Sequence, residues 1–344
     1  MTGVTMKEIA RLAGTSLSTV SRALNDNPAI SESVRGRIQQ LARELGFEVN
    51  ARGRSLATSR NGTIGIIFPD SLDDPDNASF AGMLLRSVRA ILEANALDPL
   101  VSFVRTAQSR ESNIRRLIRQ GKVDGLLLIV PALTSEEYET LLETSVPFVF
   151  LHFLPEDAER EGMEHVYVDH IEGGRLATSY LLRQGARRIL TITERERQFL
   201  ERTAGYRRAH LEEGVPVQEE LILSVDATYE AARSAIIDNS RSIAGIDAIF
   251  AQADVCALGA ISALRELGVE VPGTLPVVGY DDIRMAAIAT PSLTTVHQPQ
   301  EELARLACNR LVELLAHRGG EDSFSRILQP RLVVRESAPE RTNQ

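Results

Sequence analysis

The chain of 344 residues contains no tryptophan and only two cysteines, Cys256 and Cys308. The two cysteines are far apart and lack the paired spacing of a zinc site or a redox motif, so we expect both to be core residues without chemistry of their own. Without tryptophan, any ring that stacks on a ligand must come from phenylalanine or tyrosine.

Long apolar runs are also missing. No stretch approaches the ~18 consecutive apolar residues of a membrane-spanning helix, and the start of the chain lacks the apolar core of a secretory signal. We therefore expect a cytoplasmic protein with no membrane partner. The composition, 43% apolar and 25% charged, is that of an ordinary globular protein. Since 344 residues exceed what one hydrophobic core usually organises, we expect two or three structural units.

The sequence lacks the short motifs of several large enzyme classes. It contains no phosphate-cradling G-x-x-x-x-G-K, no G-x-S-x-G elbow and no paired metal-binding histidines. Scattered acids remain, but solvated faces explain them. We therefore expect no enzymatic activity, no metal site and no cofactor.

Charge is divided unevenly along the chain. The whole chain carries −9, but residues 1–60 hold nine Lys or Arg against five Asp or Glu, so that this segment carries +4 and the remaining 284 residues −13. Local positive charge attracts phosphates, and it marks a nucleic-acid-binding surface better than net charge does. A small basic head on an acidic body favours a DNA-binding module joined to a sensor domain.

The first 46 residues predict three helices. Thr5 and Glu8 have the spacing of a capping box, in which the hydroxyl and the carboxylate satisfy each other's backbone amides at a helix start. We therefore expect the first helix to begin after Thr5. Its apolar stripe is formed by Ile9, Ala10, Leu12 and Ala13.

Similar signals bound the other two helices. Gly14 supplies a residue that tolerates a tight turn, and Ser16 can cap a second helix that runs to about Leu24. Ser31 can cap the third helix, and Gly46 is its stop signal. The three short helices are expected to bury one small core.

From Thr63 onward, apolar runs of strand length alternate with helical patterns. This alternation predicts parallel sheets. Strands are expected at 63–68, 97–103, 124–129, 146–151, 188–192, 247–251 and 275–279, and helices at 79–95, 109–120, 135–144, 172–185, 197–213, 229–239 and 255–268. So many strands predict two doubly wound lobes, with a ligand cleft lined by the loops at the carboxyl ends of the strands.

The run Val4 to Asn25, VTMKEIARLAGTSLSTVSRALN, has the pattern of a helix-turn-helix whose second helix presents its first turn to the major groove. It closely resembles the head of the LacI family of bacterial transcription regulators. The resemblance extends through residues 27–50 and continues at intervals over nearly the whole chain. It implies a repressor whose N-terminal head reads DNA and whose core senses a small molecule.

The second helix is expected to contact the DNA bases. Leu17 and Ser18 open this helix and Arg22 lies one turn further along the same face, so we expect all three to touch base edges. Other hydroxyl and amide side chains of the head suit phosphate oxygens and are assigned to DNA contact as well: Thr5, Ser16, Thr19, Ser21, Asn25 and Ser31. Taken singly, a capping Ser or Thr can merely end a helix, and Arg22 can be a solvated charge.

Residues 50–57 resemble the family's hinge helix, which lies in the minor groove at the operator centre when paired with its dimer mate. The resemblance assigns Asn50, Arg54, Leu56 and Ala57 to DNA contact, with Leu56 as the wedge between base pairs, so we expect a central CG step. A helix this short is unstable alone, and we expect it to fold only on specific DNA. Gly53 stands where the family usually has Ala, and it disfavours the helix by about 1 kcal/mol.

Several later stretches resemble the family's ligand-binding core: 123–129, 146–149, 166–169, 172–174, 202–206, 276–282 and 291–296. The implied fold is a periplasmic-binding-protein-like core of two doubly wound parallel-sheet lobes, with chain crossings near 162, 290 and 320. The expected domains are the head (1–49), the hinge (50–60), a first lobe (61–162 with 291–320), a second lobe (163–290 with 321–338) and a tail (339–344).

The resemblance also assigns an effector site in the cleft. The matching residues are Asp70, Phe80, Asp169, Arg202, Asp254 and Gln298, and His152 is added because it follows a strand. An acid and an Arg suit adjacent hydroxyl groups, so a sugar or glycoside is expected. Asp254 has an alternative as a helix cap, and His152 as a surface or satisfied group. The sequence departs from the family at Ala253, where Asn is usual, and at His152, where Asp is frequent.

These assignments imply a dimer whose two heads bind palindromic operator DNA. We expect the ligand to shift the lobes and thereby the hinges, which is linkage between two sites. Release by an inducer is the expected outcome, and a co-repressor such as a nucleobase is the alternative. A solute-binding protein without a DNA role is a further alternative, against which the basic head counts. No heptads follow Pro330, so a dimer is favoured over a tetramer.

Overall fold

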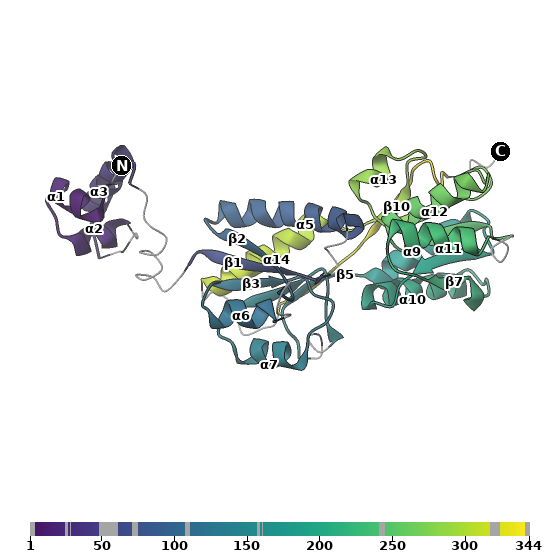
Figure 1. Cartoon of the computed structure of the whole chain (residues 1–344), viewed down its shortest axis with the longest axis horizontal. Coiled ribbons are helices and arrows are strands. Elements are labelled where there is room, and N and C mark those ends of the chain that lie inside the picture. The colour runs from purple at the N-terminus through teal and green to yellow at the C-terminus, as the bar shows by residue number, and fades with distance from the viewer. Residues whose placement is uncertain are drawn as a thin grey trace. The chain divides into compact units, whose positions relative to one another are not determined.

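Figure 1 shows the computed structural model of the chain. The structure describes residues 4–24, 27, 29–47, 61–70, 75–106, 111–156, 159, 161–240, 245–316 and 324–340, with the backbone alone at 75–80. The chain divides into two units, Met1–Thr63 and Ile64–Gln344. In the described ranges, no helix has both the length and the apolar character that crossing a bilayer requires.

The N-terminal unit contains the three predicted helices. They are α1 (Met6–Leu12), α2 (Leu17–Leu24) and α3 (Glu32–Glu44). Ile9, Val20 and Ile38, one from each helix, are fully buried and form the centre of a small core. Leu12 was expected in the apolar stripe but is 48% exposed, because it lies to one side of the face that Ile9, Ala10 and Ala13 share.

The helix starts differ in how their backbone amides are satisfied. Ser16 caps α2 as predicted, since its Oγ accepts a hydrogen bond of 3.1 Å from the Thr19 amide. The capping box at Thr5 and Glu8 is wrong: in the described part of the head, the Thr5 side chain forms no capping bond, and the Glu8 amide bonds the Thr5 carbonyl at 2.9 Å instead. Ser31 precedes α3, but among the described residues its side chain makes no capping bond either.

The second unit contains two six-stranded sheets. The first has the order β11-β5-β4-β3-β1-β2, with β1 (Thr63–Phe68), β2 (Asp98–Phe103), β3 (Gly125–Leu128), β4 (Phe148–Leu151), β5 (His165–Val168) and β11 (Ser325–Leu328). The second has the order β12-β10-β9-β8-β6-β7, with β6 (Ile189–Thr193), β7 (Ile222–Ser224), β8 (Ala248–Ala251), β9 (Val277–Asp281), β10 (Thr294–His297) and β12 (Arg331–Val333). Within the described ladders, β12 pairs antiparallel with β10, whereas strands β6 to β10 pair parallel.

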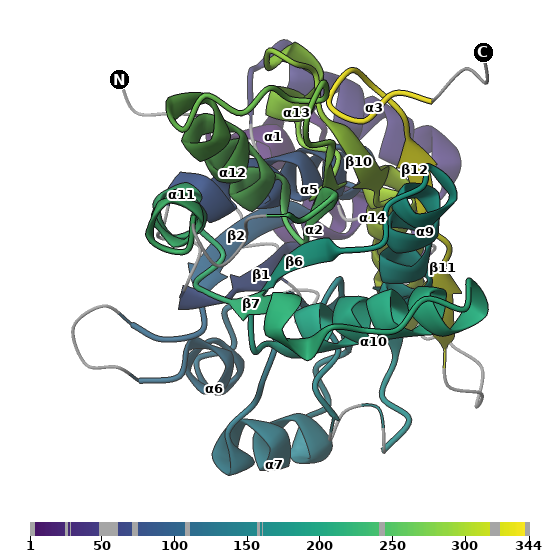
Figure 2. The same ribbon diagram turned by 90° about the vertical axis from the view of Figure 1, so that its right-hand side faces the viewer.

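Helices cover both faces of each sheet, as a doubly wound fold requires. On the first sheet, α5 (Pro75–Ala94) and α14 (Gln300–Leu315) pack on one face and α6 (Asn113–Arg119) and α7 (Ser135–Glu143) on the other (Figure 1). On the second sheet, α11 (Tyr229–Asp238) and α12 (Asp254–Glu266) lie opposite α9 (His170–Arg183) and α10 (Arg197–Glu212) (Figure 2). The short elements η2 (Glu219–Leu221) and α13 (Arg284–Ile288) complete this lobe. The fold is therefore the predicted pair of parallel-sheet lobes.

Strand pairing corrects the predicted lobe boundaries. Strand β5 pairs with β4 in the first sheet, although 163–290 was expected in the second lobe. Strand β10 pairs with β9 in the second sheet, although 291–320 was expected in the first, and β11 pairs with β5 although 321–338 was expected in the second. The chain thus crosses after Val168, after His297 and after Leu328. A buried run of four residues carries no local sign of which sheet it joins, because that choice is made by pairing with distant strands.

Candidate DNA-binding head and effector cavity

One face of α2 brings the three predicted base-reading residues together. Leu17 is 46% exposed although it is apolar, and Ser18 and Arg22 are exposed beside it. Val20 and Ala23 on the opposite side of the helix are buried. The head therefore holds α2 by one face and leaves the predicted recognition face accessible to DNA.

Hydroxyl groups gather at the start of this helix. The Ser16 Oγ lies 2.8 Å from the hydroxyls of both Ser18 and Thr19. Thr5 and Ser31 are exposed at the starts of the other two helices. These positions agree with phosphate contact, and they show that Ser16 also has the structural role of a cap.

The remaining predicted DNA-contacting residues lie on α2 away from its exposed face or outside the described residues. Ser21 is half-buried on α2. Asn25 lies outside the described residues, and so does the predicted hinge with its four assigned residues and one departure: Asn50, Arg54, Leu56, Ala57 and Gly53.

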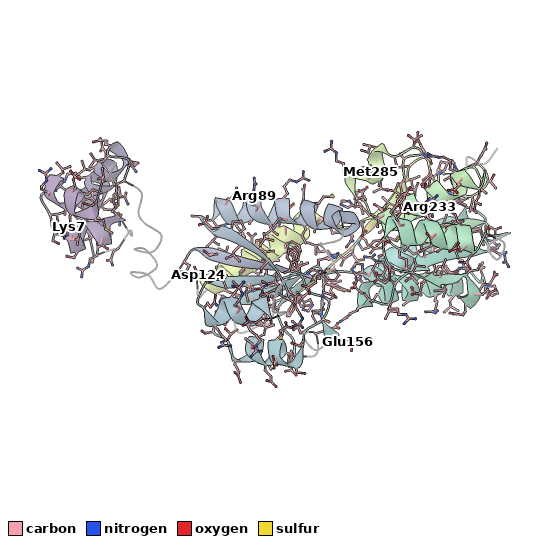
Figure 3. The ribbon with its side chains drawn as sticks, in the orientation of Figure 1. Lys7, Arg89, Asp124, Glu156, Arg233 and Met285 are labelled. Carbon is pink, nitrogen blue, oxygen red and sulfur yellow. The ribbon has the colours of Figure 1, made fainter. Side chains whose placement is uncertain are left out.

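Cationic side chains lie on the outside of the head. Lys7, which Figure 3 labels, is exposed on α1, and Arg43 is exposed on α3. Exposed cations attract the phosphate backbone whatever the base sequence. Arg37 differs, because its guanidinium donates to the carbonyl of Ala13 at 2.9 Å and so joins α3 to the end of α1.

A cavity of about 460 Å³ lies at the carboxyl ends of strands from both sheets. Its lining includes Phe68, Asp70, His152 and Phe153 from the first lobe and Glu194, Glu196, Phe199, Arg202, Asp226, Ala253 and Asp281 from the second. The volume falls in the usual range for small-molecule sites, roughly 300–1,000 Å³. The predicted strand-end cleft is therefore present.

Arg202 is the most firmly held polar group of this cavity. It is 3% exposed, and its guanidinium carbon lies 3.8 Å from the centroid of the Tyr280 ring and 4.9 Å from that of Phe199. Its Nη1 donates to the carbonyl of Gln252, and its Nε donates to His170 Nδ1 at 3.3 Å. These contacts fix the plane of the guanidinium, which leaves it oriented toward a ligand.

Asp281 faces Arg202 across 3.8 Å and was not assigned from the sequence. It ends β9, so the strand-end rule that selected Asp254 applied to it equally. Its backbone φ is 116°, a strained value for a residue with a side chain, and such strain gathers at functional sites. Burial raises the pKa of the Asp281 carboxyl, while Arg202 and the Gln298 amide lower it.

Gln298 acts through Asp281 in this arrangement. It is fully buried, and its Nε2 donates to Asp281 Oδ1 at 2.7 Å. The described lining of the cavity does not include Gln298 itself. The hydrogen bond agrees with a role in positioning the Asp281 carboxylate, and direct contact with the effector stays a prediction.

His152 lines the cavity from the end of β4. It is 4% exposed with a φ of 72°, and its ring packs edge-on against Phe153 at a centroid distance of 4.4 Å. Burial, followed by the nearby Arg202 charge, lowers the pKa of His152 to about 3. The imidazole is thus neutral at pH 7 and suited to a hydrogen bond with an uncharged polar group.

The other predicted effector residues separate into two groups. Asp70 lines the cavity and its Oδ1 accepts from the Arg105 amide at 3.1 Å. The side chain of Phe80 lies outside the described part of the chain. Asp169 caps α9 by accepting from the Glu172 amide at 2.8 Å, and the described lining does not include it.

The described lining of the cavity includes Ala253 and Val255 but not Asp254. It is fully buried at the start of α12, where its carboxylate accepts from the Ile283 amide at 2.9 Å and from the Thr295 hydroxyl. Burial and the neighbouring Asp281 charge hold the pKa of Asp254 well above its usual range. These contacts agree with a structural role, although not with the helix cap that was the alternative for this residue, because in the described structure they join α12 to Ile283 and Thr295.

Three further carboxylates line the cavity and were missed by the sequence analysis. Glu194 and Glu196 follow β6, and Asp226 follows β7. A signal was present for Glu194, which lies two positions after the predicted strand 188–192 and directly after β6. Strand β7 is only three residues long and was not predicted, so Asp226 had no strand end to mark it.

Glycines hold the cavity's supporting helices at close range. A Cβ on Gly174 of α9 would lie 2.0 Å from the Arg202 carbonyl oxygen, and one on Gly205 of α10 would lie 2.0 Å from the Ile171 carbonyl. Only residues without a side chain allow this separation. The two glycines therefore allow α9 and α10 to pack closely, and this packing positions Arg202 in the cavity.

The comparisons with known proteins agree with both the helix-turn-helix head and the two-lobed core. Residues 5–50 match the family described as bacterial regulatory proteins, lacI family, and residues 178–338 match the periplasmic binding protein-like domain. Among solved structures, the complex of the transcriptional regulator CelR with cellobiose has a TM-score of 0.71 at 30% identity and covers 97% of this chain and 99% of its own. The lac repressor dimer bound to operator and the anti-inducer ONPF has a TM-score of 0.79 at 22% identity, covers 98% and 100%, and supports the fold alone.

Two curated relatives align over nearly their whole length. The HTH-type transcriptional regulator CelR of Thermobifida fusca is 31% identical over 335 residues, which cover 97% of this chain and 98% of CelR. The ribose operon repressor of Escherichia coli strain K12 is 31% identical over 342 residues, which cover 97% and 99%. These relatives are transcription regulators and not enzymes. Similarity of this extent shows that the chain belongs to the LacI family of DNA-binding bacterial transcription regulators.

Proposed function

We propose that this regulator is a repressor that binds a palindromic operator as a dimer and is released by a sugar or glycoside entering the cavity. The observation that carries the proposal is that residues of both lobes line the cavity. A ligand that contacts both lobes favours one lobe arrangement over others, and by linkage it changes the affinity for DNA wherever that arrangement matters.

The polar groups of the cavity support a polyhydroxylated ligand. Arg202 offers donors in a fixed plane, Asp281 and Asp70 offer acceptors, and adjacent hydroxyls can bond to both kinds of group. Phe153 and Phe199 provide apolar surface for the face of a sugar ring. The relatives point the same way, since one is solved with cellobiose and another is named for a ribose operon.

Hydrogen bonds beside the cavity connect the lobes and give closure a structural consequence. Arg197 of α10 donates to the Leu154 carbonyl of the first lobe at 2.9 Å and pairs with Glu159 at 2.6 Å. Tyr167 of β5 donates to Glu201 of α10 at 2.7 Å. A change in the separation of the lobes must break these bonds or form them again. The lobes therefore have discrete arrangements, and a ligand that prefers one of them shifts the population toward it.

The experiment that tests the proposal first selects bound sequences from a random duplex pool with the full chain. Affinity for the selected duplex is then titrated with and without a panel of sugars at one salt concentration, because phosphate contacts make affinity depend on salt. Selection of a palindrome with a central CG step that one sugar releases would support the repressor. A ligand that tightens operator binding would instead identify a co-repressor, and the absence of any enriched sequence would overturn the DNA role.

The hinge has its own test within the same assay. Replacing Leu56 by Ala is expected to weaken operator binding by a few kcal/mol at most and to spare binding to unrelated DNA, because a wedge acts only where the base step opens. Equal losses on both duplexes would contradict the wedge role.

A further inference from the structure

Negative charge dominates the lining of the effector cavity. Among the described residues that line it, five carboxylates, those of Asp70, Glu194, Glu196, Asp226 and Asp281, stand against the one guanidinium of Arg202. His152 adds no positive charge, because burial lowers its pKa to about 3. Within the described residues, Arg202 pairs with Asp281 and with none of the other three second-lobe carboxylates, Glu194, Glu196 and Asp226.

Besides Asp281, the second lobe contributes three carboxylates to the lining, those of Glu194, Glu196 and Asp226. Glu194 accepts from the Ala227 backbone amide, and Glu196 accepts from the Gln198 side-chain amide. In the described ranges, neither of these residues nor Asp226 forms an ion pair with a Lys or Arg; the nearby Arg197 pairs with Glu159 and Glu201. This side of the cavity is therefore built from acceptors that lack a cation.

The proximity of these carboxylates opposes their common ionisation. Burial, then the charges of Glu196 and Asp226, raise the pKa of Glu194 to about 7. A cation placed among them would favour the ionised form of all three. Within the described residues, no group of three His, Cys, Asp or Glu side chains converges closely enough to hold a metal ion. The missing charge thus fits an organic cation better than a metal.

We propose that the effector carries a protonated amino group, which places it in the class of amino sugars and related hydroxylated amines. The ammonium group is bound by Glu194 and Asp226, and the hydroxyl groups lie toward Arg202 and Asp281. This inference rests on the proposed function, because it assigns the chemistry of the same effector. Carboxylates also accept hydrogen bonds from neutral hydroxyls, so an uncharged sugar is the competing ligand that the experiment must separate.

The test compares ligands that differ at one group. Calorimetric titration of the full-length protein uses three matched sets: glucose, glucosamine and N-acetylglucosamine; galactose, galactosamine and N-acetylgalactosamine; mannose, mannosamine and N-acetylmannosamine. Acetylation keeps the nitrogen but removes its charge. The expected result is that the amine of at least one set binds about 10- to 100-fold more tightly than both neutral members, as charge-assisted bonds predict. If no amine binds more tightly than both neutral members of its set, or if none of the nine ligands binds, the proposal is overturned.

Variants locate the preference in the cavity. The double variant Glu194→Gln with Asp226→Asn is expected to remove the preference for the amine, leaving the three members of the set within about threefold of one another. Glu220→Gln is the control for loss of a carboxylate elsewhere: it removes one negative charge from η2, where Glu220 is exposed and outside the cavity lining. Unchanged amine selectivity in the double variant would contradict the assignment. Binding of the selected duplex shows in parallel that each variant is folded.

The two levels of inference fail in different ways. If a neutral sugar releases the operator and its amine does not, the sugar-induced repressor stands and the amino-group inference falls. If an amine binds the cavity tightly but leaves operator affinity unchanged, the amino-group inference is supported and the proposal that an inducer releases the operator is contradicted.

Discussion

The guanidinium of Arg202 stacks on the ring of Tyr280, with 3.8 Å between its central carbon and the ring centroid. The Tyr280 hydroxyl in turn lies 2.9 Å from His170 Nδ1, which also accepts from Arg202 Nε. Because an arginine can only donate, His170 Nδ1 is an acceptor here and its proton is on Nε2. Burial and the Arg202 charge lower the pKa of His170, so the ring stays neutral and does not repel the guanidinium. This group of side chains positions Arg202 before a ligand arrives.

Replacing Arg202 by Lys should therefore weaken effector binding and leave operator binding unchanged. A lysine keeps the charge but loses the planar fork and the stacking, so effector affinity is expected to fall about 10- to 100-fold. Operator affinity without effector should stay within about twofold. Arg207→Lys is the control, because Arg207 lies on the same helix with its side chain paired to the exposed Glu219. Equal effector affinity in the wild type and Arg202→Lys would contradict the role given to this residue.

Asp254 should prove to be a stability residue. Asp254→Ala removes the acceptor of the buried Ile283 amide, and an unsatisfied buried donor destabilises a fold by about 1–3 kcal/mol. Asp254→Asn should remain close to the wild type, because its oxygen can accept from Ile283 and its amide can donate to Thr295. Thermal melting of the full chain measures both variants. A normal melting temperature for Asp254→Ala combined with lost effector binding would restore the ligand role.

The contrast between Asp254 and Asp281 shows where the sequence stopped being informative. Asp254 comes soon after β8 and Asp281 ends β9, and the strand-end rule does not say which carboxylate faces the cleft. That choice depends on where α12 begins: as its first residue, Asp254 is directed toward Ile283 and Thr295, which lie 29 and 41 positions further along the chain. Contacts of such separation leave no local pattern.

Other features were predictable because their signals are local. The helices of the head follow from apolar spacing and from Gly14 and Gly46, whose φ values of 62° and 61° fit the turns they were expected to make. The strands of the core follow from short buried runs. The lobe crossings do not, because β5 and β10 are assigned to a sheet only by their neighbours.

Gly174→Ala should destabilise the second lobe and disturb the cavity. The added Cβ would lie 2.0 Å from the Arg202 carbonyl, so α9 and α10 must move apart, and overpacking of this kind is expected to cost about 1–3 kcal/mol. Gly82→Ala is the control: Gly82 lies in α5 with open space at its Cβ, and alanine should stabilise the helix by up to about 1 kcal/mol. Melting temperatures that move in the same direction for both variants would contradict the packing argument.

Effector binding should depend on pH through Glu194. A cationic ligand binds the ionised carboxylate, and the pKa of about 7 in the unliganded protein means that ionisation is lost as the pH falls through neutrality. Affinity for a hydroxylated amine whose own pKa exceeds 9 is expected to fall about tenfold between pH 8 and pH 6, as the ionised fraction drops from about nine-tenths to about one-tenth. The variant Glu194→Gln should bind more weakly at pH 8 and lose most of this slope. The same slope in wild type and variant would assign the titration to another group.

Arg22 should carry base specificity on the recognition face of α2. It is exposed beside Leu17 and Ser18, so Arg22→Ala is expected to weaken binding to the selected operator by about 1–3 kcal/mol and to relax the preference at one base position in each half-site. Arg43→Ala removes the same charge from the exposed end of α3, and it should change operator and unrelated duplexes to a similar, small extent. Both variants are measured by titration at several salt concentrations, because loss of a phosphate contact alone lowers the salt slope by about one while leaving specificity intact. If Arg22→Ala behaves in that way, Arg22 positions the head on the backbone, and base reading falls to Leu17 and Ser18.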